Sequence, residues 1–292
     1  MATWSFEAIG THWEIETTDP LPAAAKAAVT AEIERFDREW SRFRADSEVV
    51  RLGRLGGVLT SADAAPMLDA YRELSVATAG AVNPLVAQSL DALGYDAAYT
   101  LIAGQPLAAP EEWDRHLSWD DGEVRASAPV LLDVGALGKG RLVDLVSAAL
   151  GRVPGDLVVD AGGDIRVRGA GVRIALEHPY DATKAIGVVE VHDHALCASA
   201  INRRAWGSGL HHVLDARTGV PVRTWAATWA LAPDAMRADA VATALFFDGG
   251  PEVAAAWGVE WVRMSTDGRV QRSPDCPAEL FLTVQNQGRV ET

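Results

Sequence analysis

The chain has 292 residues, of which 49% are apolar and 23% are charged, so it can bury a large core. This composition excludes a disordered or fibrous protein. Forty acidic residues against 26 basic ones give a net charge of −14, and an acidic surface repels the phosphate backbone of nucleic acids. Nucleic-acid binding is therefore not expected.

Cysteine content and the first residues bear on where the protein works. Cys197 and Cys276 are too few for a disulfide scaffold and too far apart in sequence for a Cys-x-x-Cys metal site. The opening MATWSFE lacks the basic and apolar regions of a signal peptide, and no run of about 20 apolar residues occurs. We expect a cytoplasmic protein with no membrane anchor in this chain.

The first third of the chain predicts one strand and two helices. Residues 13–17 alternate like a strand. Apolar residues then recur at steps of three and four, as on one face of a helix: Val29, Ile33, Phe36, Trp40 and Phe43. Ser61 is the expected N-cap of a second helix that ends at Gly80 and buries Met67, Tyr71 and Leu74.

The rest of the chain predicts more strands than helices. Residues 96–128 fit a loop with a short hairpin, 130–133 a buried strand, 135–140 a glycine turn and 142–150 a helix. Short β-rich runs at 156–160, 165–167, 172–176 and 186–191 fit an antiparallel meander. A strand at 228–231 precedes a helix that starts near Asp234 and ends at Gly249–Gly250. This order favours an α+β fold.

Two oxygen-bearing side chains lie one helical turn apart on that last helix. Asp239 and Thr243 project from the same face, and a carboxylate with a hydroxyl suits Mg²⁺. In the alternative, Thr243 bonds to a carbonyl of its own helix and Asp239 is solvated. We expect Asp239 to be exposed, so that its replacement leaves the fold intact.

The glycine turn at 133–140 lies between the predicted strand and helix, where free N–H groups favour an anion and Lys139 adds charge. The turn matches neither a Walker A loop nor a dinucleotide-binding fingerprint. In the alternative, its glycines serve only the backbone angles of a tight turn. The run Asp160–Asp164 fits a hairpin turn.

Histidine provides the remaining candidate for acid–base chemistry. His212 begins the run HVLDARTG at 212–219 and is suited to take a proton from a hydroxyl near neutral pH, unless it only makes a local hydrogen bond. His192 and His194 share one side of a predicted strand, but no third ligand accompanies them, and a zinc site is not expected.

Seven segments together resemble, in order, the ApbE-like flavin transferase family, the FAD:protein FMN transferases. They are IGT at 9–11, FRADSE at 43–48, GAVNP at 80–84 with LGY at 93–95, DVGALGKG at 133–140, AGGD at 161–164, HVLDARTG at 212–219 and ADAVATA at 238–244. The resemblance covers nearly the whole chain. It implies one domain over residues 1–292, with T-fold-like mixed antiparallel sheets packed with helices and two lobes around a flavin cleft.

The resemblance also implies an activity. Such enzymes cleave the FAD pyrophosphate and attach FMN through a phosphoester to a Thr or Ser of an acceptor flavoprotein or redox subunit, releasing AMP. Mg²⁺, or Mn²⁺ in its place, is the implied cofactor and FAD the substrate. Phosphoryl transfer requires charge neutralisation and in-line placement more than a covalent group of the enzyme.

Site residues carry over from the family's motifs. The implied metal ligands are Asp239, Thr243 and the backbone carbonyl of Ala136, and the implied catalytic residues are Asp239 and the base His212. The implied flavin contacts are Ile9, Phe43, Ala81, Val82, Asn83, Asp133, Lys139 and Val213.

The chain departs from the family pattern at four positions near these motifs. Ala216 replaces a usual proline and Ala200 a usual glycine, which removes backbone restraint from two loops. Phe43 replaces a frequent Tyr and Asn83 a common Asp. Two alternatives therefore stay open: an FAD pyrophosphatase, in which water replaces the acceptor, and a flavin-binding protein without turnover.

Overall fold

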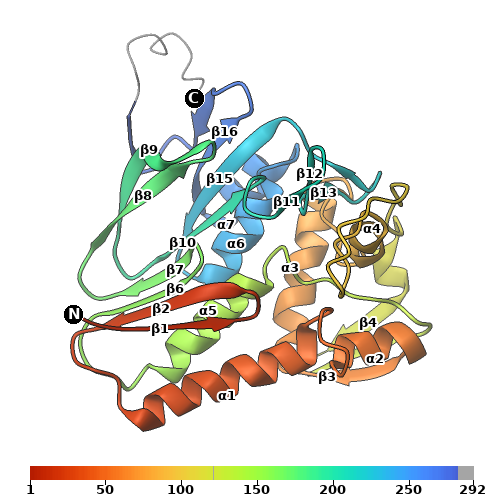
Figure 1. Ribbon diagram of the computed structural model, residues 1–292, viewed down its shortest axis with the longest axis horizontal. Coiled ribbons are helices and arrows are strands. Elements are labelled where there is room, and N and C mark those ends of the chain that lie inside the picture. The colour runs from red at the N-terminus through yellow and green to blue at the C-terminus, as the bar shows by residue number, and fades with distance from the viewer. Residues whose placement is uncertain (121, 282–292) are drawn as a thin grey trace.

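The computed structural model describes residues 1–120 and 122–281, which form 18 strands and seven α-helices (Figure 1). Every strand pair in these residues is antiparallel. The predicted α+β class with mixed antiparallel sheets and helices is therefore confirmed. None of the helices in the described residues is long and apolar enough to span a bilayer.

An eight-stranded sheet forms the centre of the fold, in the order β1-β2-β6-β7-β10-β15-β16-β17. Its strands are β1 (Ala2–Ala8), β2 (Thr11–Thr17), β6 (Leu157–Ala161), β7 (Asp164–Arg168), β10 (Ala195–Ala200), β15 (Trp225–Ala232), β16 (Glu260–Ser265) and β17 (Val270–Arg272). The strand patterns at 13–17, 156–160, 165–167 and 228–231 are confirmed, whereas the edge strand β1 was not predicted.

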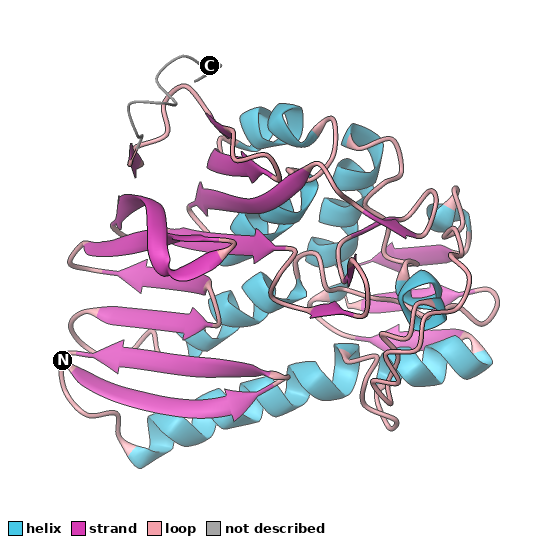
Figure 2. Ribbon diagram, turned by 45° about the horizontal axis from the view of Figure 1, so that its top comes forward, coloured by secondary structure: helices cyan, strands magenta, loops and turns pink. Residues whose placement is uncertain are grey.

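Both faces of this sheet are covered because its buried strands are apolar on both sides (Figure 2). Leu157 and Val159 of β6 join the core beneath the helices α5 (Gly138–Ala149) and α6 (Ala235–Ala244), and α1 (Ala23–Trp40) packs on α5. Val158 faces the opposite core, under the sheet of β8 (Val172–His178), β9 (Asp181–Val191) and β18 (Glu279–Leu280). The order is helices, large sheet, small sheet.

The remaining elements lie beside these layers (Figure 1). They are the helices α2 (Glu48–Leu55), α3 (Ala64–Ala77), α4 (Ala87–Ala92) and α7 (Gly250–Trp257), the 3₁₀ turn η1 (Trp113–Arg115), and the sheet of β3 (Gly57–Thr60), β5 (Glu123–Ala126) and β4 (Leu117–Asp120). Two ribbons complete the fold, β11 (Ala205–Trp206) with β12 (Leu210–His211), and β13 (Leu214–Asp215) with β14 (Val220–Pro221).

Helix α1 buries the predicted stripe at Val29, Ile33, Phe36 and Trp40. Phe43 was predicted to continue that stripe, which is wrong, because α1 ends at Trp40 and the chain turns before Phe43. Helix α3 buries the predicted Met67, Tyr71 and Leu74, but its N-cap is Asp63 rather than Ser61, whose hydroxyl accepts a hydrogen bond from the Asp63 N–H (3.2 Å).

Two further boundaries differ from the sequence predictions. Residues 130–133 form no strand, since Leu131 lies against Gly53 of α2 and the Asp133 N–H donates to the carbonyl of Pro84 (2.8 Å) rather than to a strand. Helix α6 begins as predicted, with the Asp234 side chain accepting from the Arg237 N–H (2.8 Å). It ends already at Ala244, and Gly249, at φ +85°, instead precedes α7.

Candidate active site

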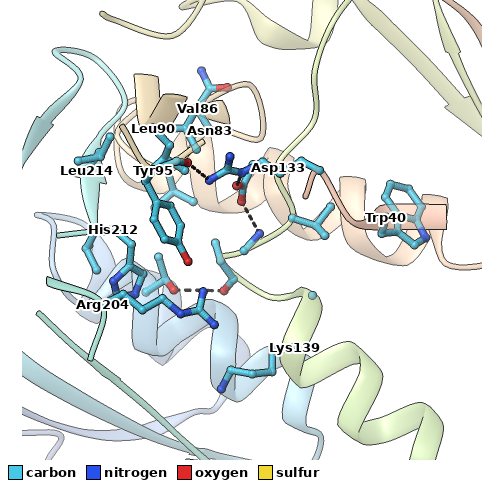
Figure 3. Close-up of a pocket in the computed structure, with 18 of the residues that line it drawn as sticks. Trp40, Asn83, Val86, Leu90, Tyr95, Asp133, Lys139, Arg204, His212 and Leu214 are labelled. Atoms are coloured by element: carbon cyan, nitrogen blue, oxygen red, sulfur yellow. Dashed lines mark hydrogen bonds and ion pairs between the residues drawn. The ribbon is translucent and has the colours of Figure 1, made fainter. Parts of the chain in front are cut away.

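A cavity of about 200 Å³ lies between the two halves of the chain and gathers most of the predicted site (Figure 3). We call it the main cavity. The predicted residues that line it are Ile9, Phe43, Ala81, Val82, Asn83, Asp133, Ala136, Lys139, His212, Val213 and Thr243. Of the predicted site residues only Asp239 does not line the cavity. Tertiary folding thus brings together residues from six separate motifs.

One end of the main cavity is aromatic. The ring of Phe43 stacks on Tyr99 (centroids 5.2 Å apart, planes at 7°) and meets the edge of Tyr95 at 5.4 Å. Tyr95 in turn stacks on Trp206 (5.3 Å). Such walls suit a flat, polarisable ring system. Tyr95 belongs to the predicted LGY motif, but its aromatic partners Tyr99 and Trp206 were not foreseen.

A buried ion network holds Asp133 at the edge of this aromatic end. The Nε of Arg42 lies 2.5 Å from Asp133 Oδ2, and its other nitrogens donate to Asp91 Oδ1 and to the Tyr95 carbonyl, both at 2.8 Å. The second oxygen of Asp133 accepts from the Gly135 N–H (2.6 Å). Because both its oxygens are engaged, the Asp133 carboxylate is fixed in place.

Gly140, in the first turn of α5, allows helices α5 and α6 to touch. A Cβ placed on Gly140 would lie 2.2 Å from the carbonyl of Ala235, so only glycine fits there. The Gly140 N–H donates to Asp239 Oδ2 (2.9 Å). This first-turn amide is therefore engaged by a carboxylate of α6, and close packing is a reason for the glycine that neither sequence hypothesis included.

Lys139 faces two buried carboxylates at the other, polar end of the main cavity. Its Nζ lies 2.5 Å from Asp164 Oδ2, in the geometry of an ion pair rather than of an aligned hydrogen bond. Asp164 is fully buried and Asp239 is 4% exposed. Burial lowers the pKa of Lys139, but the charges of Asp164 and Asp239 outweigh that effect and raise it, so the ammonium stays charged.

The expectation that Asp239 is exposed is wrong, because α5 crosses α6 at Gly140 and covers the carboxylate. Burial, followed by the nearby charge of Asp164, raises the pKa of Asp239 well above its usual value. Two carboxylates therefore share one lysine, and the second carboxylate is costly to ionise unless a further positive charge is nearby. Such an arrangement favours a cation.

Thr243 and Ala136 meet as the family pattern implies for two metal ligands. The hydroxyl of Thr243 donates across the cavity wall to the Ala136 carbonyl at 3.2 Å, from α6 to the turn before α5. No group of three or more His, Cys, Asp or Glu side chains that could bind a metal occurs in the described part of the chain. The oxygen donors nevertheless fit Mg²⁺, which keeps several waters and commonly takes further ligands from phosphates.

His212 lines the main cavity from the short segment between β12 and β13 (Figure 3). Its Nδ1 is buried and has no hydrogen-bond partner among the described residues. Burial, then the charges of Arg204 and His211, lower the pKa of His212 to about 3, so the imidazole is neutral at physiological pH and is a weak base in the free protein. His211, by contrast, is held by a contact of Nε2 with the Val222 carbonyl (2.8 Å).

Arg204 is the main residue that the sequence analysis missed. It lines the main cavity, and Figure 3 shows its guanidinium directed to the same interior as Lys139 and His212. Within residues 1–120 and 122–281 it forms no ion pair, whereas its neighbour Arg203 pairs with Glu177 (3.0 Å). Two adjacent arginines gave no sequence signal to separate them; only the fold assigns them different surroundings.

Comparison with known proteins places this geometry in a family. The sequence model of the ApbE family matches residues 9–262. The chain belongs to the ApbE family. An FAD:protein FMN transferase of Rhodobacter capsulatus is 29% identical over 304 residues, covering 94% of this chain. The chain spans only 58% of that relative's length.

Solved ApbE structures share the fold. The ApbE protein of Thermotoga maritima superposes with a TM-score of 0.81 at 22% identity, covering 94% of this chain and 97% of its own. The flavin transferase ApbE from Vibrio cholerae gives 0.76 at 22% identity with the same coverage. The Pseudomonas stutzeri flavinyl transferase ApbE in its apo form gives 0.77 at 20% identity, covering 94% of each chain. At these identities the likeness establishes the ApbE fold.

Proposed function

We propose that this protein is an FAD:protein FMN transferase that uses Mg²⁺ to move FMN from FAD to a Ser or Thr of an acceptor protein, with release of AMP. The observation that carries the proposal is the main cavity, whose aromatic end suits a flavin and whose polar end suits a diphosphate. The R. capsulatus relative bears the name of this activity.

Charge at the polar end supports the phosphoryl-transfer step. The Lys139 ammonium and the Arg204 guanidinium supply positive charge where the diphosphate of FAD would lie. Asp239, Thr243 and the Ala136 carbonyl would hold the cation, whose role when bound is to neutralise phosphate oxygens as they gain charge. Electrostatic stabilisation of this kind is the main demand of phosphoryl transfer.

His212 supplies the acid–base part of the proposal. Its neutral imidazole takes the proton from the acceptor hydroxyl as that oxygen bonds to the phosphorus of the FMN half. The bond from this phosphorus to the bridging oxygen breaks, and AMP leaves with that oxygen. The nucleophile comes from the partner, so no side chain of this chain forms a covalent intermediate.

The flavin contacts complete the proposal. We assign Ile9, Phe43, Ala81, Val82, Asn83, Asp133, Lys139 and Val213 to FAD binding, since all of them line the main cavity. Asn83 is already engaged, because its amide nitrogen donates to the Pro110 carbonyl and its oxygen accepts from the Leu85 N–H, both at 2.8 Å. We therefore expect it to shape the wall rather than to bond the flavin through its side chain.

The test is incubation of the purified protein with FAD and Mg²⁺, with and without a cell extract as the source of acceptors. We expect AMP release and a protein whose Ser or Thr gains FMN in mass spectrometry, and loss of both on chelation with EDTA. Steady AMP release without any acceptor would instead indicate an FAD pyrophosphatase. Tight FAD binding that survives EDTA, without AMP in any condition, would indicate a binding protein.

A further inference from the structure

A second cavity, of about 100 Å³, adjoins the main cavity. We call it the side cavity. Ser199 lines both cavities, so the two are neighbours across one residue of β10. The other walls of the side cavity include Gly162, Gly163, Ala175, Ala198, Ala200 and Trp229. At the end of β10 and in the turn before β7 the side chains are small or absent, which allows another backbone to approach closely, whereas larger residues such as Ile165, Ile174 and Leu196 form other walls.

The end of β10 has one open edge at the side cavity. On one side β10 pairs with β15 as far as Ala200 opposite Ala227. On the other side its pairing with β7 stops earlier, at Cys197 opposite Asp164, because the chain turns away at Gly162 and Gly163. No strand of the described residues therefore flanks Ser199–Ala200 on the β7 side.

The register shows which backbone groups face this open edge. The Ile201 N–H donates toward β15, to the Ala226 carbonyl (3.0 Å), and the Ala198 N–H donates toward β7, to the Gly163 carbonyl (3.0 Å). Backbone groups alternate along a strand, so those of Ala200 also point to the β7 side.

Two of these groups are available to a partner. The Ala200 carbonyl already accepts from the Arg203 N–H (3.3 Å), whereas no acceptor within the described residues is aligned with the Ala200 N–H. The Gly163 N–H donates to Asp160 Oδ1 (2.8 Å) rather than to the Ala198 carbonyl. The Ala200 N–H and the Ala198 carbonyl thus form a donor and an acceptor on one strand edge, two residues apart.

We propose that an extended segment of the acceptor protein docks here, adding to β10 as a short strand in the side cavity and presenting its Ser or Thr hydroxyl to the main cavity past Ser199. This inference rests on the proposed function. Strand addition takes affinity from main-chain hydrogen bonds and selectivity from pockets for alternate side chains. The charged residues Arg203 and Glu177 of the side cavity already pair with each other. The segment is therefore recognised by its shape and its backbone rather than by its charge.

The position of the side cavity supports this occupant. The acceptor hydroxyl must reach the polar end of the main cavity, and an extended chain carries alternate side chains to opposite faces. A segment paired with β10 therefore turns one side chain toward Trp229 and the next toward the main cavity. The small side cavity predicts a small or medium-sized neighbour to the modified residue.

The test uses the protein that gains FMN from the wild-type enzyme in the extract experiment, purified as substrate. Ala198 is half-buried, lines the side cavity and lies on the face of β10 that packs toward the small sheet, so Ala198→Phe places a ring in that cavity. Ala200→Pro removes the free N–H at an extended position. The matched control is Ala182→Phe, an equal change at an exposed position of β9 that lines neither cavity.

We expect both test variants to raise the KM for the acceptor roughly tenfold or more, the loss of about one hydrogen bond or pocket contact. Their FAD affinity should match the wild type, which also shows that they fold. Wild-type acceptor kinetics in both variants, or an equal loss in Ala182→Phe, would overturn the docking site while leaving the proposed function standing. Absence of FMN transfer by the wild type would contradict the proposed function and the docking site with it.

Discussion

The two ends of the main cavity are built on different principles. At the aromatic end, Arg42 satisfies Asp133 and Asp91 together, and its guanidinium lies over the Phe43 ring at 4.1 Å. At the polar end, Asp164 accepts no aligned hydrogen bond and His212 Nδ1 has no partner among the described residues. Buried polar groups are normally satisfied, so the first end is complete by itself, whereas the second keeps polar atoms that the proposed substrate and cation would engage.

We therefore expect the aromatic end to contribute mainly to stability and the polar end mainly to activity. Changes at the aromatic end should cost folding free energy, because they break interactions that exist in the free protein. Changes at the polar end should cost activity with little loss of stability, since the interactions they remove form mainly with ligands. The predictions below test this division, from the largest expected effect to the smallest.

Arg42→Leu should destabilise the protein by about 3 kcal/mol, because it leaves the Asp133 carboxylate, only 12% exposed, without its guanidinium partner. The free energy of unfolding from urea titration measures the effect. Arg38→Leu on α1 is the control, since its pair with Glu34 is exposed and should contribute less than about 1 kcal/mol. Equal losses in the two variants would contradict the special role of the aromatic end.

Asp239→Asn should lower AMP release at least about 100-fold, the scale of losing a main electrostatic contribution. The amide oxygen can still accept from the Gly140 N–H, and the neutral amide avoids the burial and the repulsion by Asp164 that raise the pKa of Asp239, so the melting temperature should not fall. Calorimetry and AMP assays on the same sample compare the two effects. Full activity in this variant would exclude Asp239 from the site.

His212→Gln should slow FMN transfer by roughly 100-fold, within the range for removal of a general base. FAD affinity should stay near the wild-type value, because no charge is removed at neutral pH. Fluorescence titration with FAD measures the affinity, and labelling of the acceptor measures the rate of FMN transfer. A matched loss of both would assign His212 to binding instead.

Arg204→Gln should weaken FAD binding roughly tenfold, as expected for a charge-assisted hydrogen bond to phosphate. Riboflavin, which has no phosphate, should bind equally well to the variant and to the wild type. Arg203→Gln is the matched control, because Arg203 is already paired with Glu177. Weaker riboflavin binding in Arg204→Gln would place this side chain on the flavin ring.

The pH dependence of stability gives the smallest expected effect. Since burial lowers the folded-state pKa of His212 to about 3, the unfolded chain binds one more proton than the folded one between that value and about 6.5. The contribution of neutral His212 to stability is therefore present above pH 6.5 and is lost as the pH falls toward 3. His212→Gln should lose less stability than the wild type between pH 7 and 5 in urea titrations.

Local sequence patterns identified most elements, because periodicity and capping are properties of neighbouring residues. The stripe of α1, the strands at 156–160 and 165–167 and the Asp234 cap are examples. The prediction of one meander is wrong, because β8 and β9 form a separate sheet with β18. The predictions failed where an element depends on distant contacts. Residues 130–133 have a strand composition but no neighbouring strand to pair with, and β1 is a strand only because β2 lies beside it.

Motif order in the sequence was sufficient to predict the family and eleven of the residues that line the main cavity, since these positions carry family-specific residue types. Tertiary structure alone decided that Asp239 is buried, that Lys139 pairs with Asp164, and that Arg204 rather than Arg203 faces the cavity. The physical reason is that burial and charge pairing depend on which elements pack against each other, as α5 does against α6. A carboxylate under Gly140 and a strand end left open at Ala200 are consequences of packing, which no local pattern records.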